Sequence, residues 1–195
     1  MSTLKGKVVL VGDTSVGKTA IVHCFNRLSI DVSPTIGANS ITCNVKFDNG
    51  ETVQLNIWDT AGQDDFQCLV PMYARCAQVA LVVYDQSQPS SFASTEKWID
   101  HMKNSVGVPN VFLVGNKMDL EEVVDTEKAI EFAETHQVRF FRTSALNGNG
   151  VDDLFQEIAV VVNTPEKQTE EVQPVFKTDV NLEESKEKKK KSGCC

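Results

Sequence analysis

The sequence predicts an α/β protein with a doubly wound, mostly parallel six-stranded sheet and helices on both of its faces. Short continuous apolar runs, such as residues 79–84 and 110–115, are typical of strands buried on both faces of a parallel sheet. Stretches with the apolar spacing of helices separate or follow these runs. Two alternating segments flank "DNG" at residues 48–50, and this pattern predicts a hairpin with the one antiparallel strand.

The first half of the chain is predicted to form a strand, a helix and the hairpin, in that order. The strand covers residues 7–12. Ile21, Phe25 and Leu28 then recur at i, i+4 and i+7, which is the spacing of one helix face. The hairpin strands alternate with period two, and the side chains expected on their buried face are Ile41, Cys43, Val45, Phe47, Val53, Leu55 and Ile57.

The second half alternates strands with helices. Strands are predicted at residues 79–84, 110–115 and 139–143. Helices are predicted around residues 126–136 and by two sets of spaced apolar residues, which are Phe92, Ile99 and Met102 and then Leu154, Ile158 and Val161. Periodicity stops after residue 163 and charged residues dominate, so residues 165–195 are expected to be disordered and residues 1–164 to form the domain.

Composition indicates an ordinary cytosolic protein. A chain of 195 residues is long enough for one compact domain with a tail. No apolar run approaches the ~20 residues of a spanning helix, and the first residues lack the apolar stretch of a secretory signal. Six scattered cysteines fit a reducing compartment better than a disulfide framework. From residue 165 onward seven acidic residues balance seven lysines, so the body carries the net charge of −8, which argues against nucleic-acid binding.

Residues 12–19, "GDTSVGKT", match the phosphate-binding loop (P-loop) between a strand and a helix. The glycines let backbone N–H groups surround the phosphates, and the helix that follows presents its positive end. Lys18 is expected to reach the β- and γ-phosphates and the Thr19 hydroxyl to bind Mg²⁺. The loop alone does not distinguish ATP from GTP, or a hydrolase from a kinase.

Two further motifs predict that the base is guanine and that the nucleotide is hydrolysed. In "NKMD", residues 116–119, the Asp119 carboxylate is placed to accept from the ring N–H and the exocyclic amine of guanine, a donor pair that adenine lacks. In "WDTAGQ", Asp59 is expected near Mg²⁺, the Gly62 N–H at the γ-phosphate, and Gln63 beside an attacking water. Thr35 in "SPTIGA" is the remaining candidate Mg²⁺ ligand, in a loop that a γ-phosphate orders.

With these motifs in order, followed by "TSA" at residues 143–145, the sequence resembles the Ras-like small GTPases and, within them, the Rab branch. The resemblance covers roughly residues 5–163 and the last two cysteines, and residues 69–85 look most like early-endosomal members. It implies a GTP-binding G domain, with Lys18, Thr35, Gly62 and Gln63 in catalysis. The implied nucleotide-binding residues are Asp13, Thr14, Ser15, Val16, Gly17, Lys18, Thr19, Ala20, Thr35, Gly62, Asn116, Lys117, Asp119, Ser144, Ala145 and Leu146.

The resemblance also implies a monomeric switch in membrane traffic that hydrolyses GTP slowly. An activating protein would supply an arginine finger worth on the order of 10³–10⁵ in rate. An exchange factor, a prenylation escort, a GDP-dissociation inhibitor and effectors would be its other partners. The effector surface is expected at Ile36, Gly37, Ser40, Trp58, Phe66 and Tyr73.

Four departures from the family distinguish this chain. The interval from Thr19 to Thr35 is two residues shorter than usual, and the position of the aromatic residue that covers guanine falls on Ile30. Leu146 replaces the lysine of the usual "SAK", so we predict a looser base pocket, in which Ser144 and Ala145 still offer backbone N–H groups to guanine. Ser40 replaces the phenylalanine of the family's Phe-Trp-Tyr effector triad. Finally, "GQDDF" replaces "GQERF", and together the last two changes predict unusual effectors and exchange factors.

The chain's end, "KKKKSGCC", predicts a membrane anchor. Cys194 and Cys195 resemble the double-geranylgeranyl signal of Rab proteins, and two lipids give stable anchoring where one is marginal. Lysines 188–191 would add attraction to an anionic cytosolic leaflet of endosomal or other vesicle membranes. The alternatives are a solvated lysine run and a redox or metal-binding cysteine pair.

Two rival functions stay open on the sequence alone. A pseudo-switch that holds its nucleotide as a structural ligand is favoured by the altered base pocket and by Asp64 and Asp65. Intact Thr35, Asp59 and Gln63 oppose it. A P-loop phosphotransferase would need an arginine-rich lid, and the four arginines of this chain are spread apart.

Overall fold

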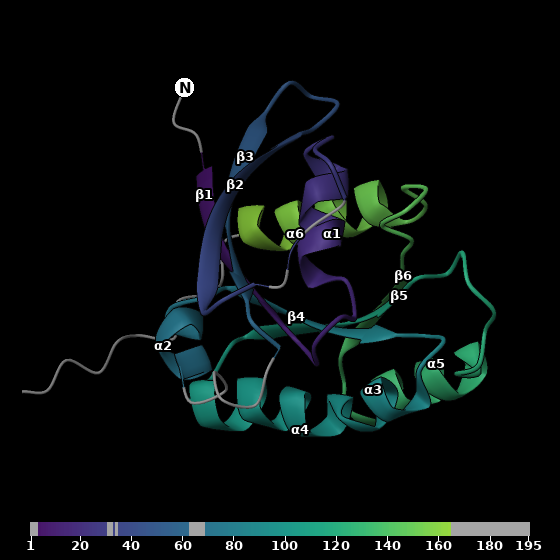
Figure 1. Ribbon diagram of the computed structural model, residues 1–195. Coiled ribbons are helices and arrows are strands. Elements are labelled where there is room, and N and C mark those ends of the chain that lie inside the picture. Colours follow the sequence, from purple (N-terminus) through teal and green to yellow (C-terminus); the bar gives the residue numbers. More distant parts are fainter. Residues whose placement is uncertain (1–3, 31–32, 34, 63–68, 165–195) are drawn as a thin grey trace, which may run out of the picture. The chain divides into compact units, whose positions relative to one another are not determined.

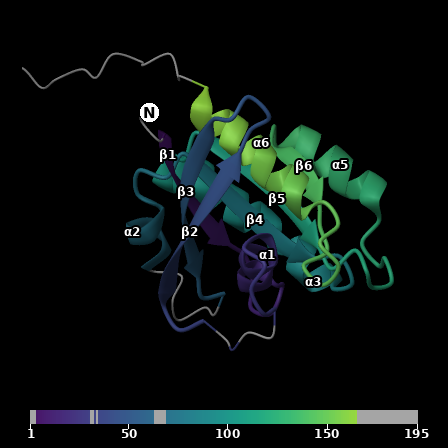
Figure 2. The same cartoon turned by 90° about the horizontal axis from the view of Figure 1, so that it is seen from above.

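The computed structural model describes residues 4–30, 33, 35–62 and 69–164. A six-stranded sheet forms the centre of this part of the chain, with the order β2-β3-β1-β4-β5-β6 (Figures 1 and 2). Strands β2 and β3 pair antiparallel and the remaining neighbours pair parallel, which confirms the predicted fold class. The strands are β1 (Leu4–Val11), β2 (Ala38–Lys46), β3 (Thr52–Thr60), β4 (Val79–Asp85), β5 (Asn110–Asn116) and β6 (Arg139–Arg142).

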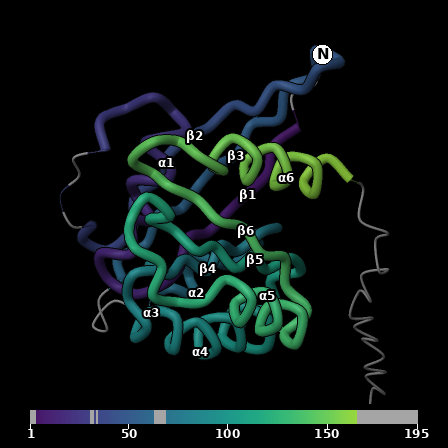
Figure 3. Tube along the Cα trace, turned by 90° about the vertical axis from the view of Figure 1, so that its right-hand side faces the viewer, coloured from purple at the N-terminus to yellow at the C-terminus, as the bar shows by residue number. Residues whose placement is uncertain are grey.

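Helices cover both faces of the sheet, as Figure 3 shows from the side. Helices α1 (Lys18–Phe25) and α6 (Val151–Asn163) lie on one face. The other face carries α2 (Val70–Ala74), α3 (Pro89–Ala93), α4 (Thr95–Asp100), the π-helix η2 (His101–Val106) and α5 (Thr126–Thr135). The buried strands contribute alternate side chains to two separate cores, so that Val8 and Leu10 lie in the core with α1 and α6, while Val9 and Val11 lie in the core with α2 and α4.

Two predicted helices differ from the structure. Helix α1 ends at Phe25, and Leu28 lies beyond it with 53% of its surface exposed, so the expected i+7 position is wrong. Arg27 adopts a φ of 56°, which ends the helical path before Leu28 can join the core face. The single helix expected around Phe92, Ile99 and Met102 is divided into α3, α4 and η2.

The parallel pairing brings the functional loops to one edge of the sheet. Asp85 pairs with Asn116 and Gly115 pairs with Arg142, so β4, β5 and β6 end within one residue of each other, while β1 ends at Val11, opposite Val82 of β4. The loops that leave the carboxyl ends of β1, β4, β5 and β6 therefore meet, as expected at the ligand-binding edge of an open α/β sheet. Within the described residues, no helix combines the length and the apolar character that crossing a membrane requires.

Candidate functional site

The P-loop turns between β1 and α1 in a backbone path that only glycine allows at two positions. Gly12 has a φ of 136°, and a Cβ there would lie 2.2 Å from the Val83 carbonyl oxygen. Gly17 has a φ of 97°, and a Cβ there would lie 2.3 Å from Asn116 Nδ2. Gly17, at the N-cap of α1, has no side chain that could offer an oxygen to the first amides of the helix. These amides stay available to an anion.

Lys18 lies inside this loop with 6% of its surface exposed. Its Nζ donates to the carbonyl oxygens of Gly12 at 2.8 Å and Asp13 at 2.7 Å. Burial lowers the pKa of Lys18 to about 8, although the carboxylates of Asp59 and Asp13 oppose the change. Because the hydrogen bonds of this buried ammonium to described residues end on carbonyl groups, it gains when a phosphate supplies full negative charge.

Thr19, Thr35 and Asp59 come from three separate segments and meet beside the P-loop. Asp59 Oδ2 accepts from the Thr19 hydroxyl at 2.6 Å and from the Thr35 hydroxyl at 3.3 Å, and the two hydroxyl oxygens lie 3.1 Å apart. Asp59 is fully buried, and its Oδ1 has no hydrogen-bond partner among the described residues. Burial raises the pKa of Asp59, despite hydrogen bonds from both threonines and the nearby Lys18 charge. An oxygen-only donor set with an unsatisfied carboxylate oxygen fits a hard divalent cation such as Mg²⁺.

Gly62 closes the phosphate end of the site. A Cβ at this position would lie 2.4 Å from the carbonyl carbon and oxygen of Asp13 and 2.5 Å from Thr14 N, so the backbone there approaches the P-loop as only glycine can. A cavity of about 250 Å³ adjoins these groups, lined by Thr14, Ser15, Gly17, Lys18, Thr19, Ala20, Ser33, Thr35, Thr60 and Gly62.

The "NKMD" segment at the end of β5 connects the loops at the base end of the site, where guanine is expected to bind. Asn116 Nδ2 donates to the Val16 carbonyl at 2.9 Å, and Asn116 Oδ1 accepts from Thr143 Oγ1 at 3.1 Å and Ala145 N at 3.2 Å. Asp119 accepts from the Ser144 hydroxyl. Asn116 therefore ties the P-loop to the loop after β6, while Asp119 is exposed and held by a side chain of that loop.

In the loop after β6, the N–H groups predicted to meet guanine have protein acceptors, and their contact with the base stays a prediction. The Ser144 and Ala145 N–H groups, expected to meet the guanine carbonyl, donate to Asn149 O at 2.9 Å and to Asn116 Oδ1. A carbonyl of the base at this place would share these donors with the protein. Leu146 is 67% exposed.

The residues predicted for effector recognition lie partly on one surface. The rings of Trp58 and Tyr73 stack with their centroids 5.5 Å apart, and Lys7 Nζ lies 5.1 Å from the centroid of Trp58. Ser40 is paired with Trp58 across the β2–β3 hairpin. Ile36 is 86% exposed, and the Gly37 carbonyl accepts from Ala61 N at 2.7 Å. Gln63, Asp64, Asp65, Phe66, Cys194 and Cys195 lie outside the described residues.

Two residues beside the site were missed by the sequence analysis. Trp98 of α4 donates from Nε1 to Asp13 Oδ1 at 3.1 Å, so this hydrogen bond links a core helix to the P-loop. Asp85, at the end of β4, forms an ion pair with Lys117. The sequence signal for Asp85 is a single carboxylate that ends an apolar strand at the ligand-binding edge. For Trp98 the sequence indicates only a helical residue.

Comparison with known proteins decides the family. A model of the Ras family matches residues 7–164. The chain belongs to the Ras family. The Ras-related protein Rab-5B of Plasmodium falciparum is 39% identical over 159 residues, which are 80% of this chain and 76% of that protein. The GTP-binding protein YPT52 of Saccharomyces cerevisiae is 37% identical in an alignment of 188 positions that covers 80% of this chain and 80% of that protein. The Ras-related protein Rab-22A of Canis lupus familiaris is 40% identical over 159 residues, which are 78% of this chain and 81% of that protein.

This Ras-family chain is therefore a small GTPase of the Rab branch, as its motifs predicted. It binds GTP and GDP, hydrolyses GTP, and functions in vesicle trafficking.

Proposed function

We propose that this small GTPase is a Mg²⁺-dependent switch that recruits effectors while GTP is bound, on the cytosolic face of early-endosomal or related vesicle membranes. The observation that carries the proposal is the meeting of Thr19, Thr35 and Asp59 beside the buried Lys18. Thr35 belongs to a segment far from the P-loop in sequence, so its hydroxyl links that segment to the phosphate end of the site.

Thr19 and Thr35 would hold Mg²⁺ through their hydroxyl oxygens, with Asp59 acting through a bound water. When bound there, Mg²⁺ neutralises charge on the phosphate oxygens. The unsatisfied Oδ1 of Asp59 supports this assignment, because a buried carboxylate oxygen without a partner is costly unless a cation or water completes it.

Other groups of the chain would bind the phosphates and orient the attacking water. Lys18 and the P-loop amides hold the β- and γ-phosphates, and the Gly62 N–H meets the γ-phosphate. Gln63 orients the attacking water. Lys18 is the cationic side chain that hydrogen-bonds to the P-loop backbone, and an arginine supplied by an activating protein would add a second positive charge and accelerate hydrolysis strongly.

Guanine is recognised by the exposed carboxylate of Asp119, while Asn116 holds the surrounding loops together. Leu146 replaces a long cationic side chain with an aliphatic one, and this substitution favours faster nucleotide release than in relatives with lysine. An exchange factor would then act on a site that is already less tightly closed.

The exposed Ile36 and the stacked Trp58–Tyr73 pair support an effector surface beside the site. Ser40 next to Trp58 removes a large anchor, so effectors selected by an aromatic residue at this place would bind weakly. Two lipids on Cys194 and Cys195 would anchor the protein, with a prenylation escort and a GDP-dissociation inhibitor handling the lipidated chain.

The test is to load the full-length protein with GTP and Mg²⁺ and to chromatograph the bound nucleotide over several hours. Slow conversion to GDP that stays bound would support a switch that depends on an exchange factor, and a Gln63→Leu control should retain GTP. Persistent unhydrolysed GTP in the wild-type protein would instead indicate a pseudo-switch.

A further inference from the structure

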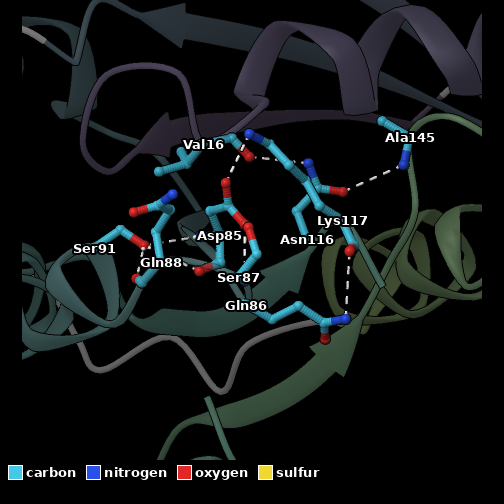
Figure 4. Close-up of polar contacts among 9 residues, drawn as sticks. All are labelled: Val16, Asp85, Gln86, Ser87, Gln88, Ser91, Asn116, Lys117 and Ala145. Carbon is cyan, nitrogen blue, oxygen red and sulfur yellow. Dashed lines mark hydrogen bonds and ion pairs between the residues drawn. The ribbon is translucent and has the colours of Figure 1, made fainter. Parts of the chain in front are cut away.

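Asp85 is a buried carboxylate whose every oxygen has a partner. Its Oδ2 lies 2.7 Å from Lys117 Nζ. Its Oδ1 accepts from the backbone N and the hydroxyl of Ser87, at 2.9 and 2.7 Å (Figure 4). Burial acts to raise the pKa of Asp85, but the hydrogen bonds from Lys117 and Ser87 outweigh it and leave the pKa below its usual value. Asp85 is therefore an ionised anchor for the Lys117 ammonium.

The backbone conformation of Lys117 is uncommon for a residue with a side chain, so contacts with neighbouring residues must stabilise it. Its φ is 65°, in the left-handed region. Its carbonyl accepts from Gln86 Nε2 at 3.3 Å and from Leu120 N at 2.9 Å, which fixes the turn that contains Asp119. The Asp85–Lys117 ion pair and these two hydrogen bonds thus hold the same turn from both its side chain and its backbone.

The ion pair also lies beside the P-loop, which the neighbouring Asn116 contacts through the Val16 carbonyl. A cavity of about 350 Å³ is lined by both members of the ion pair, by P-loop residues 13–16, and by Gln88, Ser90 and Ser91 of the segment after β4. Figure 4 shows the Lys117 side chain extending from β5 toward Asp85 and past the Val16 carbonyl that Asn116 contacts. Without the Asp85 carboxylate, the partly exposed Lys117 side chain would be free to turn into solvent.

We propose that Asp85 is a positioning residue for guanine recognition, which fixes Lys117 and thereby the turn that presents Asp119. The inference rests on the nucleotide site proposed above, since it concerns how that site is held in place. Asp85 itself does not contact the base in this assignment. Its effect passes through Lys117.

The test compares the release of fluorescent GDP and IDP from full-length protein with Mg²⁺. Inosine lacks the exocyclic amine of guanine, so the ratio of the two release rates measures the hydrogen bond to Asp119. Asp85→Asn is expected to release GDP about tenfold faster, the order of one charge-assisted hydrogen bond. IDP release should change less, and the ratio should approach one. A general loss of stability would accelerate both nucleotides equally and would overturn the proposal.

Three further variants sharpen the test. Asp125→Asn makes the same chemical change at the N-cap of α5, where asparagine caps as well as aspartate, and should leave both rates unchanged. The double variant Asp85→Asn with Lys117→Met should release GDP no faster than Lys117→Met alone, because Asp85 acts only through that lysine. Asp85→Glu keeps the charge but displaces it. It should lower the discrimination between GDP and IDP even if the asparagine variant does not fold.

The outcomes separate this inference from the proposed function. Wild-type protein that does not prefer GDP to ADP would overturn the nucleotide site and this inference together. Wild-type protein that prefers GDP, with an Asp85→Asn variant of unchanged release rates and GDP/IDP ratio, would overturn only the role of Asp85.

Discussion

The two ends of the nucleotide site are built in opposite ways. At the phosphate end, Lys18 and Asp59 are buried charges, and one oxygen of Asp59 has no partner among the described residues. At the base end, Asp119 and Leu146 are exposed, and Asn116 and the N–H groups near it already have protein partners. The phosphate end therefore has polar groups that a ligand would satisfy, whereas the base end keeps its shape through its own hydrogen bonds. Affinity should depend mainly on the first end and selectivity on the second.

The largest expected effect is at the phosphate end. Lys18→Met should weaken the binding of GDP and GTP about a hundredfold, because it removes a buried cation that forms charge-assisted hydrogen bonds to phosphate. Titration calorimetry with each nucleotide measures the loss. Lys128→Met, which changes an exposed lysine of α5, is the matched control and should bind normally. Equal affinities for Lys18→Met and wild type would contradict the assignment.

Asp59→Asn should remove most of the gain in nucleotide affinity that Mg²⁺ provides, by about tenfold or more, since the neutral amide no longer supports the cation. The measurement is nucleotide affinity with Mg²⁺ and with EDTA, for wild type and variant. Asp152→Asn changes an exposed carboxylate on α6 and should keep the full Mg²⁺ effect. If Asp59→Asn retained that effect as well, the cation site would be elsewhere.

At the base end, a substitution should strengthen nucleotide binding. Leu146→Lys restores the side chain that the family resemblance implies, and we expect GDP release to slow about tenfold, equivalent to roughly 1.4 kcal/mol. Stopped-flow release of fluorescent GDP measures the change. Leu120→Lys adds the same charge at another exposed leucine of this end and separates packing on the base from general attraction to phosphate. An equal slowing by both variants would show that charge alone acts.

The smallest effect concerns pH in the nucleotide-free protein. The pKa of Lys18 is about 8 in the folded state and 10.5 in the unfolded reference, so the unfolded chain binds more protons between these values. Stability should therefore rise with pH from about 8 to 10.5, by a few degrees in Tm relative to Lys18→Met. Thermal unfolding of both proteins across this range measures the difference. A parallel course of the two curves would mean that Lys18 is ordinarily charged throughout.

Local patterns predicted most of the fold because each depended on neighbours in the sequence. Apolar runs located β4 and β5, and alternation located the hairpin. The prediction that Leu28 belongs to the buried helix face was wrong because the left-handed backbone at Arg27 ends the helical path. Apolar spacing carries no signal for such a turn. The division of the helix predicted around Phe92, Ile99 and Met102 into α3, α4 and η2 likewise has no counterpart in periodicity.

For the site, the sequence by itself determined which chemistry is present. The P-loop, Asp59 and "NKMD" each act through residue type and short spacing, which a sequence displays directly. Only the tertiary structure decided that Trp98 touches Asp13 and that Asp85 pairs with Lys117. Hydrogen bonds and ion pairs between segments depend on strand order and on the level at which parallel strands end, and these are set by packing across the whole sheet.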